Sequence, residues 1–83
     1  MSAAQAGPQW TREEAALVRE WVHEDFAAAL AFVNAVGALA EEHGHHPDIL
    51  LHGWNRVRLT LSTHSAGGLT PADEALAAAL DDI

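Results

Sequence analysis

The stretch DFAAALAFVNAVGALAEEHGHHP, residues 25–47, decides the fold because it combines a long apolar helix with a histidine pair after its end. Asp25 is a favoured helix N-cap, and apolar side chains follow it with helical spacing. Gly44 is a favoured residue just past a helix C-terminus, since it adopts a positive φ without a Cβ clash. The sequence therefore predicts a helix over residues 26–40, followed closely by two imidazoles.

This predicted helix is apolar on nearly all sides, with Asn34 as its only polar side chain. An ordinary surface helix has a polar face, and a run of this length is too short to span a bilayer. Burial on two sides explains the pattern: one face would cover the sheet of its own chain, and the other would contact a partner subunit. We therefore expect a homo-oligomer, either a dimer or a tetramer.

Short strands and a second helix are predicted downstream. Residues 49–51 form a short strand, and residues 56–63 alternate apolar and polar side chains, as a strand with one buried face does. A flexible loop with two glycines follows at 65–68. Thr70 is a favoured N-cap for a last helix, which has a proline at its first position and Asp73 at its third.

The N-terminal part allows two interpretations. Residues 1–7 are small and polar, and we expect them to be disordered. Thr11 followed three positions later by Glu14 fits a helical capping box. The same region also fits a hairpin turn before a strand over residues 17–22. The local signals favour the helix slightly.

The composition limits the class of protein. A chain of 83 residues forms one domain, and the absence of cysteine excludes disulfides and thiolate metal sites. A formal net charge of −8 disfavours attraction to nucleic acid or to an anionic membrane. The chain does not open with a basic segment followed by an apolar one, so we expect no signal peptide and a cytoplasmic location.

Three histidines and one aspartate form the candidate site, namely His45, His46, His64 and Asp73. An imidazole can both give and take a proton near neutral pH, and a carboxylate can orient it. Each residue also has a plain structural explanation: an exposed pair after a helix, a polar strand end, or an acidic residue that caps a helix. A metal site is disfavoured, because zinc usually takes ligands from separated elements, whereas adjacent histidines point apart.

The spacing of these residues resembles the signature of the pterin-4a-carbinolamine dehydratases. The matching positions are Glu41, three residues, His45-His46-Pro47, six residues, Trp54, nine residues, His64, eight residues and Asp73. Thr63-His64 and Gly67-Gly68-Leu69-Thr70 also look like that family. The similarity runs from Trp10 to the C-terminus.

The resemblance implies an α+β fold for residues 8–83, with a four-stranded antiparallel sheet and helices packed on one face. It implies a hairpin over residues 10–22, in place of the helix that the local signals favour. It also implies dimers or tetramers, in agreement with the expectation from the two-sided apolar helix.

The resemblance further implies a reaction, the dehydration of 4a-hydroxytetrahydropterin to quinonoid dihydropterin, which recycles the pterin cofactor of aromatic amino acid hydroxylases. The family uses no metal and no organic cofactor. His45 and His64 would be the acid/base pair at the 4a-hydroxyl group. His46 would position the substrate, and Asp73 would support His64. The pterin pocket would be lined by Gly44, His45, His46, Pro47, Ser62, Thr63, His64 and Ser65.

A second interpretation stays open, because relatives of that family act without catalysis, as a dimerisation cofactor for a transcription factor or as an assembly chaperone. The chain also departs from the family pattern in three places. Little chain precedes Trp10, and His23 stands where an aromatic residue is common. One extra residue, best assigned to Gly53, precedes Trp54 and suggests a bulge or a longer turn beside the pocket.

Overall fold

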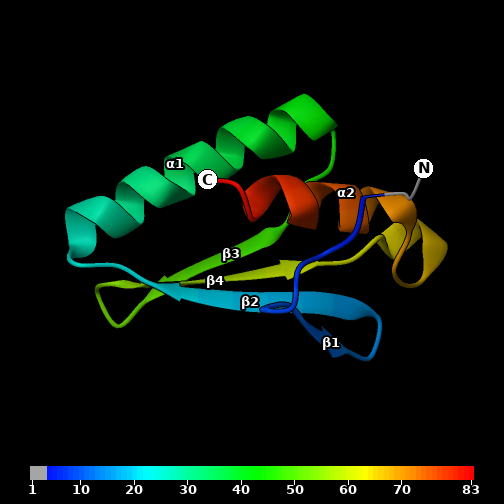
Figure 1. Cartoon of the computed structure of the whole chain (residues 1–83), viewed down its shortest axis with the longest axis horizontal. Helices are drawn as coiled ribbons and strands as arrows, with labels where there is room; N and C mark the ends of the chain where they lie inside the picture. The colour runs from blue at the N-terminus through cyan, green and yellow to red at the C-terminus, as the bar shows by residue number, and fades with distance from the viewer. Residues whose placement is uncertain (1–3) are drawn as a thin grey trace.

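Two helices cover one face of a four-stranded antiparallel sheet, which is the α+β fold that the resemblance implied (Figure 1). The computed structural model describes residues 4–83. The elements in chain order are β1 (Thr11–Glu13), β2 (Ala16–Val22), α1 (Phe26–His43), β3 (Asp48–His52), β4 (Arg56–Leu61), the 3₁₀ helix η1 (His64–Ala66) and α2 (Pro71–Leu80). Strands β2 and β4 lie at the centre of the sheet, and β1 and β3 form its edges.

The alternation along β4 separates a buried face of the sheet from an exposed one. Val57, Leu59 and Leu61 are fully buried, whereas Arg58 between them is exposed. Leu17 of β2 pairs with Leu61 and is buried in the same core. The period-two pattern in the sequence therefore correctly identified the face that the helices cover.

The N-terminal region forms a hairpin of β1 and β2, so the helix that local signals favoured there is wrong. Glu14 lies in the turn with a positive φ of 53°. A capping box is worth about 1 kcal/mol, whereas burial of one large apolar side chain contributes about 1.5–3 kcal/mol. The hairpin contributes Leu17 and the preceding Trp10 to the core, with exposures of 0% and 7%. Tertiary burial thus outweighs the local signal.

Helix α1 begins and ends at the predicted signals. The Asp25 carboxylate accepts a hydrogen bond from the N–H of Ala28 at 2.8 Å. Gly44 adopts a left-handed conformation with φ of 60°, and its N–H bonds back to the carbonyl of Glu41. The helix runs to His43, nearly one turn beyond the predicted end at residue 40. The charged residues that follow Ala40 continue the helix, and Gly44 ends it.

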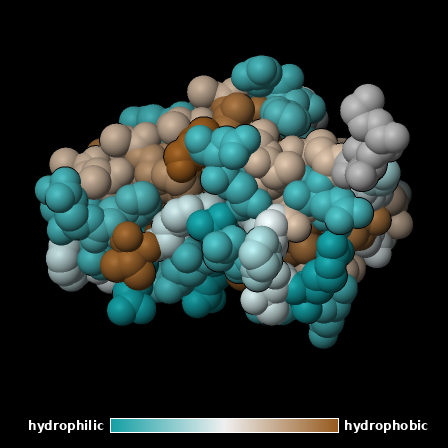
Figure 2. Space-filling model, in the orientation of Figure 1, coloured by the Kyte–Doolittle hydropathy of each residue, from teal (hydrophilic) through white to brown (hydrophobic). Residues whose placement is uncertain are grey.

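Only one face of α1 is covered within a single chain. Ala29 and Val36 are fully buried against the core, whereas Phe26 and Leu30 are 51% and 46% exposed. Figure 2 shows apolar atoms along this helix on the surface of the molecule. Within residues 4–83, no helix combines the length and the apolarity needed to cross a membrane.

The N-terminal segment lies against α2 through two acidic side chains. Residues 1–3 of the segment that we expected to be disordered lie outside the described residues. The N–H of Ala6 donates to Glu74 at 2.9 Å, and the N–H of Gly7 donates to Asp81 at 2.8 Å. These bonds hold the chain across α2 before β1 begins.

Asp81 joins this segment to the sheet as well. Its Oδ1 accepts hydrogen bonds from the indole N–H of Trp10 at 2.7 Å and from the guanidinium of Arg19 at 2.5 Å. The Asp81 side chain is 20% exposed, so these bonds are partly shielded from water. One carboxylate therefore connects the end of α2, the N-terminal segment and β2.

The turn between β3 and β4 contains the extra residue. Gly53 and Trp54 both take positive φ, at 55° and 58°. This turn follows the far end of β3, whereas the histidine pair precedes that strand (Figure 1). The longer turn is therefore not beside the histidine pair, contrary to our expectation, because the length of β3 separates the two.

Substitution of Asp81 by Asn should lower the free energy of unfolding by about 1–2 kcal/mol, because hydrogen bonds to a partly buried charge are lost. Urea denaturation followed by tryptophan fluorescence measures this difference. Asp82→Asn, at the exposed neighbouring position, is the matched control and should leave the stability within about 0.5 kcal/mol of the wild type. Equal stability of the two variants would contradict the proposed role of Asp81.

Candidate active site

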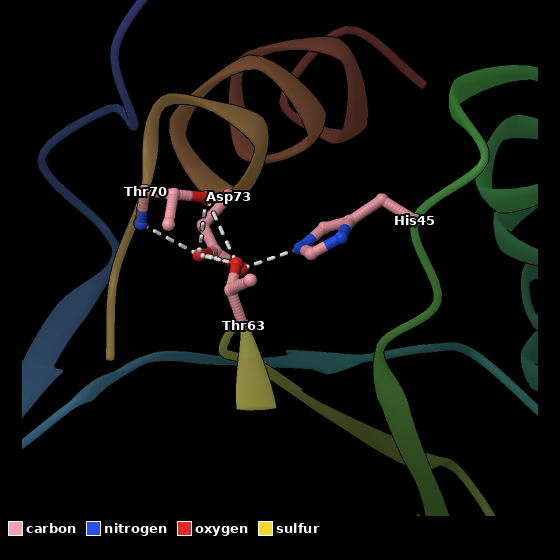
Figure 3. A network of polar contacts seen from close by, with 4 residues as sticks. All are labelled: His45, Thr63, Thr70 and Asp73. Carbon is pink, nitrogen blue, oxygen red and sulfur yellow. Dashed lines mark hydrogen bonds and ion pairs between the residues drawn. The ribbon is translucent and has the colours of Figure 1, made fainter. Parts of the chain in front are cut away.

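The Asp73 carboxylate is fully buried and joins three parts of the chain (Figure 3). Its Oδ2 accepts hydrogen bonds from the N–H of Thr70 at 2.9 Å and from the hydroxyl of Thr63 at 2.7 Å. Its Oδ1 lies 2.6 Å from Nε2 of His45. The network thus connects the start of α2, the end of β4 and the segment after α1.

Local sequence places Asp73 and its two threonine partners. Thr70 is the N-cap of α2, so the third helical residue, Asp73, turns its carboxylate back toward the N-cap N–H. Thr63 follows β4 in an extended conformation and forms an isolated bridge with Gly68. This bridge closes the loop that carries η1 and brings the two threonine hydroxyls within 2.8 Å of each other.

The end of α1 places His45. Gly44 reverses the chain in the left-handed conformation, and the N–H of His45 bonds to the carbonyl of Ala40 at 3.1 Å. The imidazole then points at Asp73, and its side chain is 16% exposed. An imidazole in this position is held by a buried carboxylate and still reaches the surface.

The environment of Asp73 favours its charged form. Burial opposes ionisation and would raise the pKa of this carboxyl group. The hydrogen bonds from His45, the Thr63 hydroxyl and the Thr70 N–H outweigh that effect, so the pKa of Asp73 lies below its ordinary value. The site therefore holds a carboxylate anion behind His45 at neutral pH.

His46 lies on the surface and has a different partner. Its Nε2 pairs with the carboxylate of Glu41 one turn earlier on α1, and the two side chains are 62% and 78% exposed. A pair this exposed gains little free energy, since water competes for both groups. His46 is thus free to turn toward a bound molecule.

The resemblance implied that Asp73 would support His64. The structure instead pairs Asp73 with His45. Thr63 directs its hydroxyl at Asp73, and together with His45 and the Thr70 N–H it supplies the hydrogen bonds that Asp73 accepts. His64 is the first residue of η1 and is exposed. Sequence spacing could not show which of the histidines Asp73 would reach.

Within residues 4–83, a smaller and a larger hollow lie near the sheet, and the smaller one borders the candidate site. It has a volume of about 330 Å³ and is lined by Ser62, Thr63 and His64 together with residues 13–16 of the β1–β2 hairpin. A larger hollow of about 700 Å³ lies on the outer face of the sheet, beside Glu20 of β2 and Arg58, its cross-strand partner on β4. That face is opposite the Asp73 network, so the larger hollow is not the candidate active site, despite its size.

The predicted pocket residues fall into two groups. Ser62, Thr63 and His64 line the smaller hollow, whereas Gly44, His45, His46, Pro47 and Ser65 do not. Sequence reasoning missed Glu13 and Glu14 as hollow-lining residues, because only the pairing of β2 with β4 brings the turn of the hairpin close to the end of β4. The capping role that the sequence predicted for Asp73 is confirmed, since its carboxylate accepts the hydrogen bond of the Thr70 N–H.

A sequence model for the family described as pterin 4 alpha carbinolamine dehydratase matches residues 1–83. The chain belongs to this family. Two relatives are provisionally named pterin-4-alpha-carbinolamine dehydratase. The protein from Chloroflexus aurantiacus is 55% identical to this chain, over 92% of this chain and 81% of its own length. The other, from Thermomicrobium roseum, is 51% identical over 99% of this chain and 87% of its own.

Two solved structures of pterin dehydratase type share the fold. A transcriptional coactivator/pterin dehydratase from Brucella melitensis superposes with a TM-score of 0.81, at 31% identity over 90% of this chain and 81% of its own. A pterin dehydratase-like protein described as a RuBisCO assembly factor in the alpha-carboxysome gives a TM-score of 0.69, at 29% identity over 95% of this chain and 87% of its own. Relatives on this scaffold thus have more than one role.

The low pKa of Asp73 predicts a specific effect of acid on stability. In the unfolded chain the carboxyl group of Asp73 has a pKa of about 3.9. Its ionised form therefore stabilises the folded state at all pH values above that pKa. The contribution is lost as pH falls through the lower, folded-state pKa. The stability difference between the wild type and Asp73→Asn should therefore be about 1–3 kcal/mol at pH 7 and should shrink in acid.

Urea unfolding of both proteins at pH 7 and near pH 3 measures this loss. Asp48→Asn, an exposed carboxyl group at the start of β3, is the matched control and should show a difference near zero at both pH values. A difference for Asp73→Asn that stays constant or grows as the pH falls would be inconsistent with the lowered pKa.

Proposed function

We propose that this chain is an active dehydratase that converts 4a-hydroxytetrahydropterin to quinonoid dihydropterin by histidine acid/base catalysis. In that role it would recycle the pterin cofactor of aromatic amino acid hydroxylases. The observation that carries the proposal is the contact between His45 and the fully buried Asp73. Membership of the family supplies the substrate class.

A buried carboxylate of this kind is costly for a protein that needs only a scaffold. Removing a charge from water costs several kcal/mol, and an apolar replacement is often neutral or stabilising. Asp73 is kept charged by hydrogen bonds and holds an imidazole that still reaches the surface. The cost is understandable if the imidazole exchanges protons with a substrate, because the anion stabilises its charged form.

The remaining histidines have distinct parts in this proposal. His64 lines the smaller hollow and would be the second acid/base group. His46, exposed beside Glu41, would position the substrate. The substrate would lie across the surface between the histidine pair and the hollow, against Gly44, His45, His46, Pro47, Ser62, Thr63, His64 and Ser65. The protein itself would act in the cytoplasm, without a metal or an organic cofactor.

A non-catalytic assembly role is the second candidate. The relative described as a RuBisCO assembly factor has the same fold, and the apolar side chains of α1 offer a surface for another protein. A pull-down with untagged partners from the source cell distinguishes the two roles. Recovery of one stable partner, together with no dehydratase activity, would favour assembly.

The catalytic proposal predicts faster loss of 4a-hydroxytetrahydropterin in a hydroxylase-coupled assay. His45→Gln should lower kcat by about 10²–10⁴-fold, because positioned proton transfer contributes that much to a rate. His43→Gln, an exposed histidine at the end of α1, is the matched control and should keep the wild-type rate. A wild-type protein that does not accelerate the reaction would exclude the dehydratase.

We also propose that the chain forms a homo-oligomer through the uncovered face of α1 and the adjacent edge of the sheet. Phe26 and Leu30 of α1 and Ile49 and Leu50 of the edge strand β3 are large apolar side chains that are at least 39% exposed. An edge strand also offers unpaired backbone groups to a second copy. Burying this surface would remove the apolar side chains from water.

Sedimentation velocity at micromolar concentration tests the assembly. The wild type should sediment as a dimer or tetramer, and Leu30→Glu should shift it toward the monomer, because a charge would be buried in the contact. Asp82→Asn, far from α1 in the sequence and exposed, serves as the control and should sediment as the wild type does. A monomeric wild type would refute the proposal.

A further inference from the structure

The hydroxyl groups around Asp73 have a defined hydrogen-bond direction. Each threonine hydroxyl has one hydrogen to donate. Thr63 lies 2.7 Å from Oδ2 of Asp73 and donates its hydrogen there. The contact of 2.8 Å between the two threonine hydroxyls is then a bond that Thr70 donates. The longer distance of 3.4 Å from the Thr70 hydroxyl to Oδ2 agrees with this order.

All donors around Oδ2 therefore point toward the carboxylate. The Thr70 N–H adds a third, fixed donor at 2.9 Å, because a backbone amide can only donate. Together with the hydrogen bond from His45, these donors hold the pKa of Asp73 below its ordinary value despite burial. An ionised carboxylate can only accept, so the contact at Oδ1 requires a hydrogen on Nε2 of His45.

A hydrogen on Nε2 leaves the other ring nitrogen for chemistry. In the neutral imidazole, one nitrogen carries hydrogen and the other has a lone pair, so Nδ1 becomes the acceptor. Figure 3 shows Nδ1 turned away from Asp73. The opposite tautomer would need a protonated Asp73 that donates from Oδ1, which the donors at Oδ2 disfavour.

We propose that Nδ1 of His45 is the atom that exchanges a proton with the substrate, and that Thr63 is a positioning residue that fixes this choice. Thr63 acts through Asp73: its hydroxyl hydrogen occupies Oδ2, so that Oδ1 is left for Nε2 of His45. This inference rests on the proposed dehydratase function for the identity of the substrate.

The proton balance follows from this assignment. The imidazolium form of His45 carries hydrogen on both nitrogens, and Nδ1–H gives its proton to the hydroxyl oxygen on the 4a carbon. The carbon–oxygen bond breaks with its electron pair on oxygen, which leaves as water. The adjacent nitrogen loses its hydrogen as a proton to a second base, and its electron pair forms the new carbon–nitrogen double bond. Throughout, Nε2–H stays bonded to Asp73.

Nitrogen-15 NMR of the histidine rings tests the tautomer without any substrate. At a pH where His45 is neutral, the wild type should show Nε2 with hydrogen and Nδ1 without. The wild-type spectrum decides this point even if a variant does not fold. Observation of the opposite tautomer would overturn the inference.

Steady-state kinetics test the positioning residue. Thr63→Val removes the hydroxyl at nearly constant volume, and kcat should fall about tenfold, since one hydrogen bond to a charge contributes on the order of that factor. KM should change by less than about twofold, because valine keeps the shape that Thr63 presents to the substrate, and the lost hydroxyl is bonded to Asp73. The NMR spectrum of this variant should show a mixture of the two tautomers of His45.

Two further variants separate this role from a general loss of stability. Thr63→Ser keeps the hydroxyl and should restore both the tautomer and kcat. Thr60→Val makes the same substitution on the outer face of β4 and should change neither quantity. A Thr63→Val protein with the wild-type tautomer and the wild-type kcat would disprove the role of Thr63. A wild type without dehydratase activity would instead refute the proposed function, and the NMR spectrum would still decide the tautomer.

Discussion

The structure depends on one buried negative charge. Asp73 has no exposed surface, and a carboxylate in such a place is stable only with hydrogen bonds to its oxygens. The donors come from Thr70 in the N-cap, Thr63 after β4 and His45 after α1. Because each donor must be within hydrogen-bond distance, this requirement fixes the start of one helix, the end of another and the end of a central strand relative to one another.

A second carboxylate fixes the other end of α2. Asp81 lies at the C-terminus of that helix, where the helix dipole disfavours a negative charge. Hydrogen bonds from the Trp10 indole and the Arg19 guanidinium offset this effect. Trp10 also packs edge-to-face on Trp21, with ring centroids 5.6 Å apart, so the contact continues into the core. In a domain with a thin core, carboxylates at both ends of α2 define its position and hence that of the site.

The fold separates its polar site from the exposed apolar side chains at the start of α1. The Asp73 network lies where the end of α1, the end of β4 and the start of α2 meet. The exposed apolar side chains Phe26 and Leu30 are near the opposite end of α1 and share no residue with the network. Changes at the start of α1 need not disturb the site, and this independence gives a physical reason why one scaffold supports both dehydratase and assembly roles among its relatives.

The sequence by itself determined the elements whose signals are local. The caps Asp25, Gly44 and Thr70 and the alternation along β4 set the helix ends and the buried face of the sheet, because each acts within a few residues. The spacing around His45 was sufficient to identify the family.

Only the tertiary structure decided the features that need residues distant in the chain. The hairpin of β1 and β2 formed against a local helix signal, because burial of Leu17 in a shared core is worth more than a cap. Asp73 reached His45 and not His64, because the left-handed turn at Gly44 brings the residue after α1 to the start of α2. Such choices depend on how the helices and strands pack together, and no local pattern in the sequence encodes that arrangement.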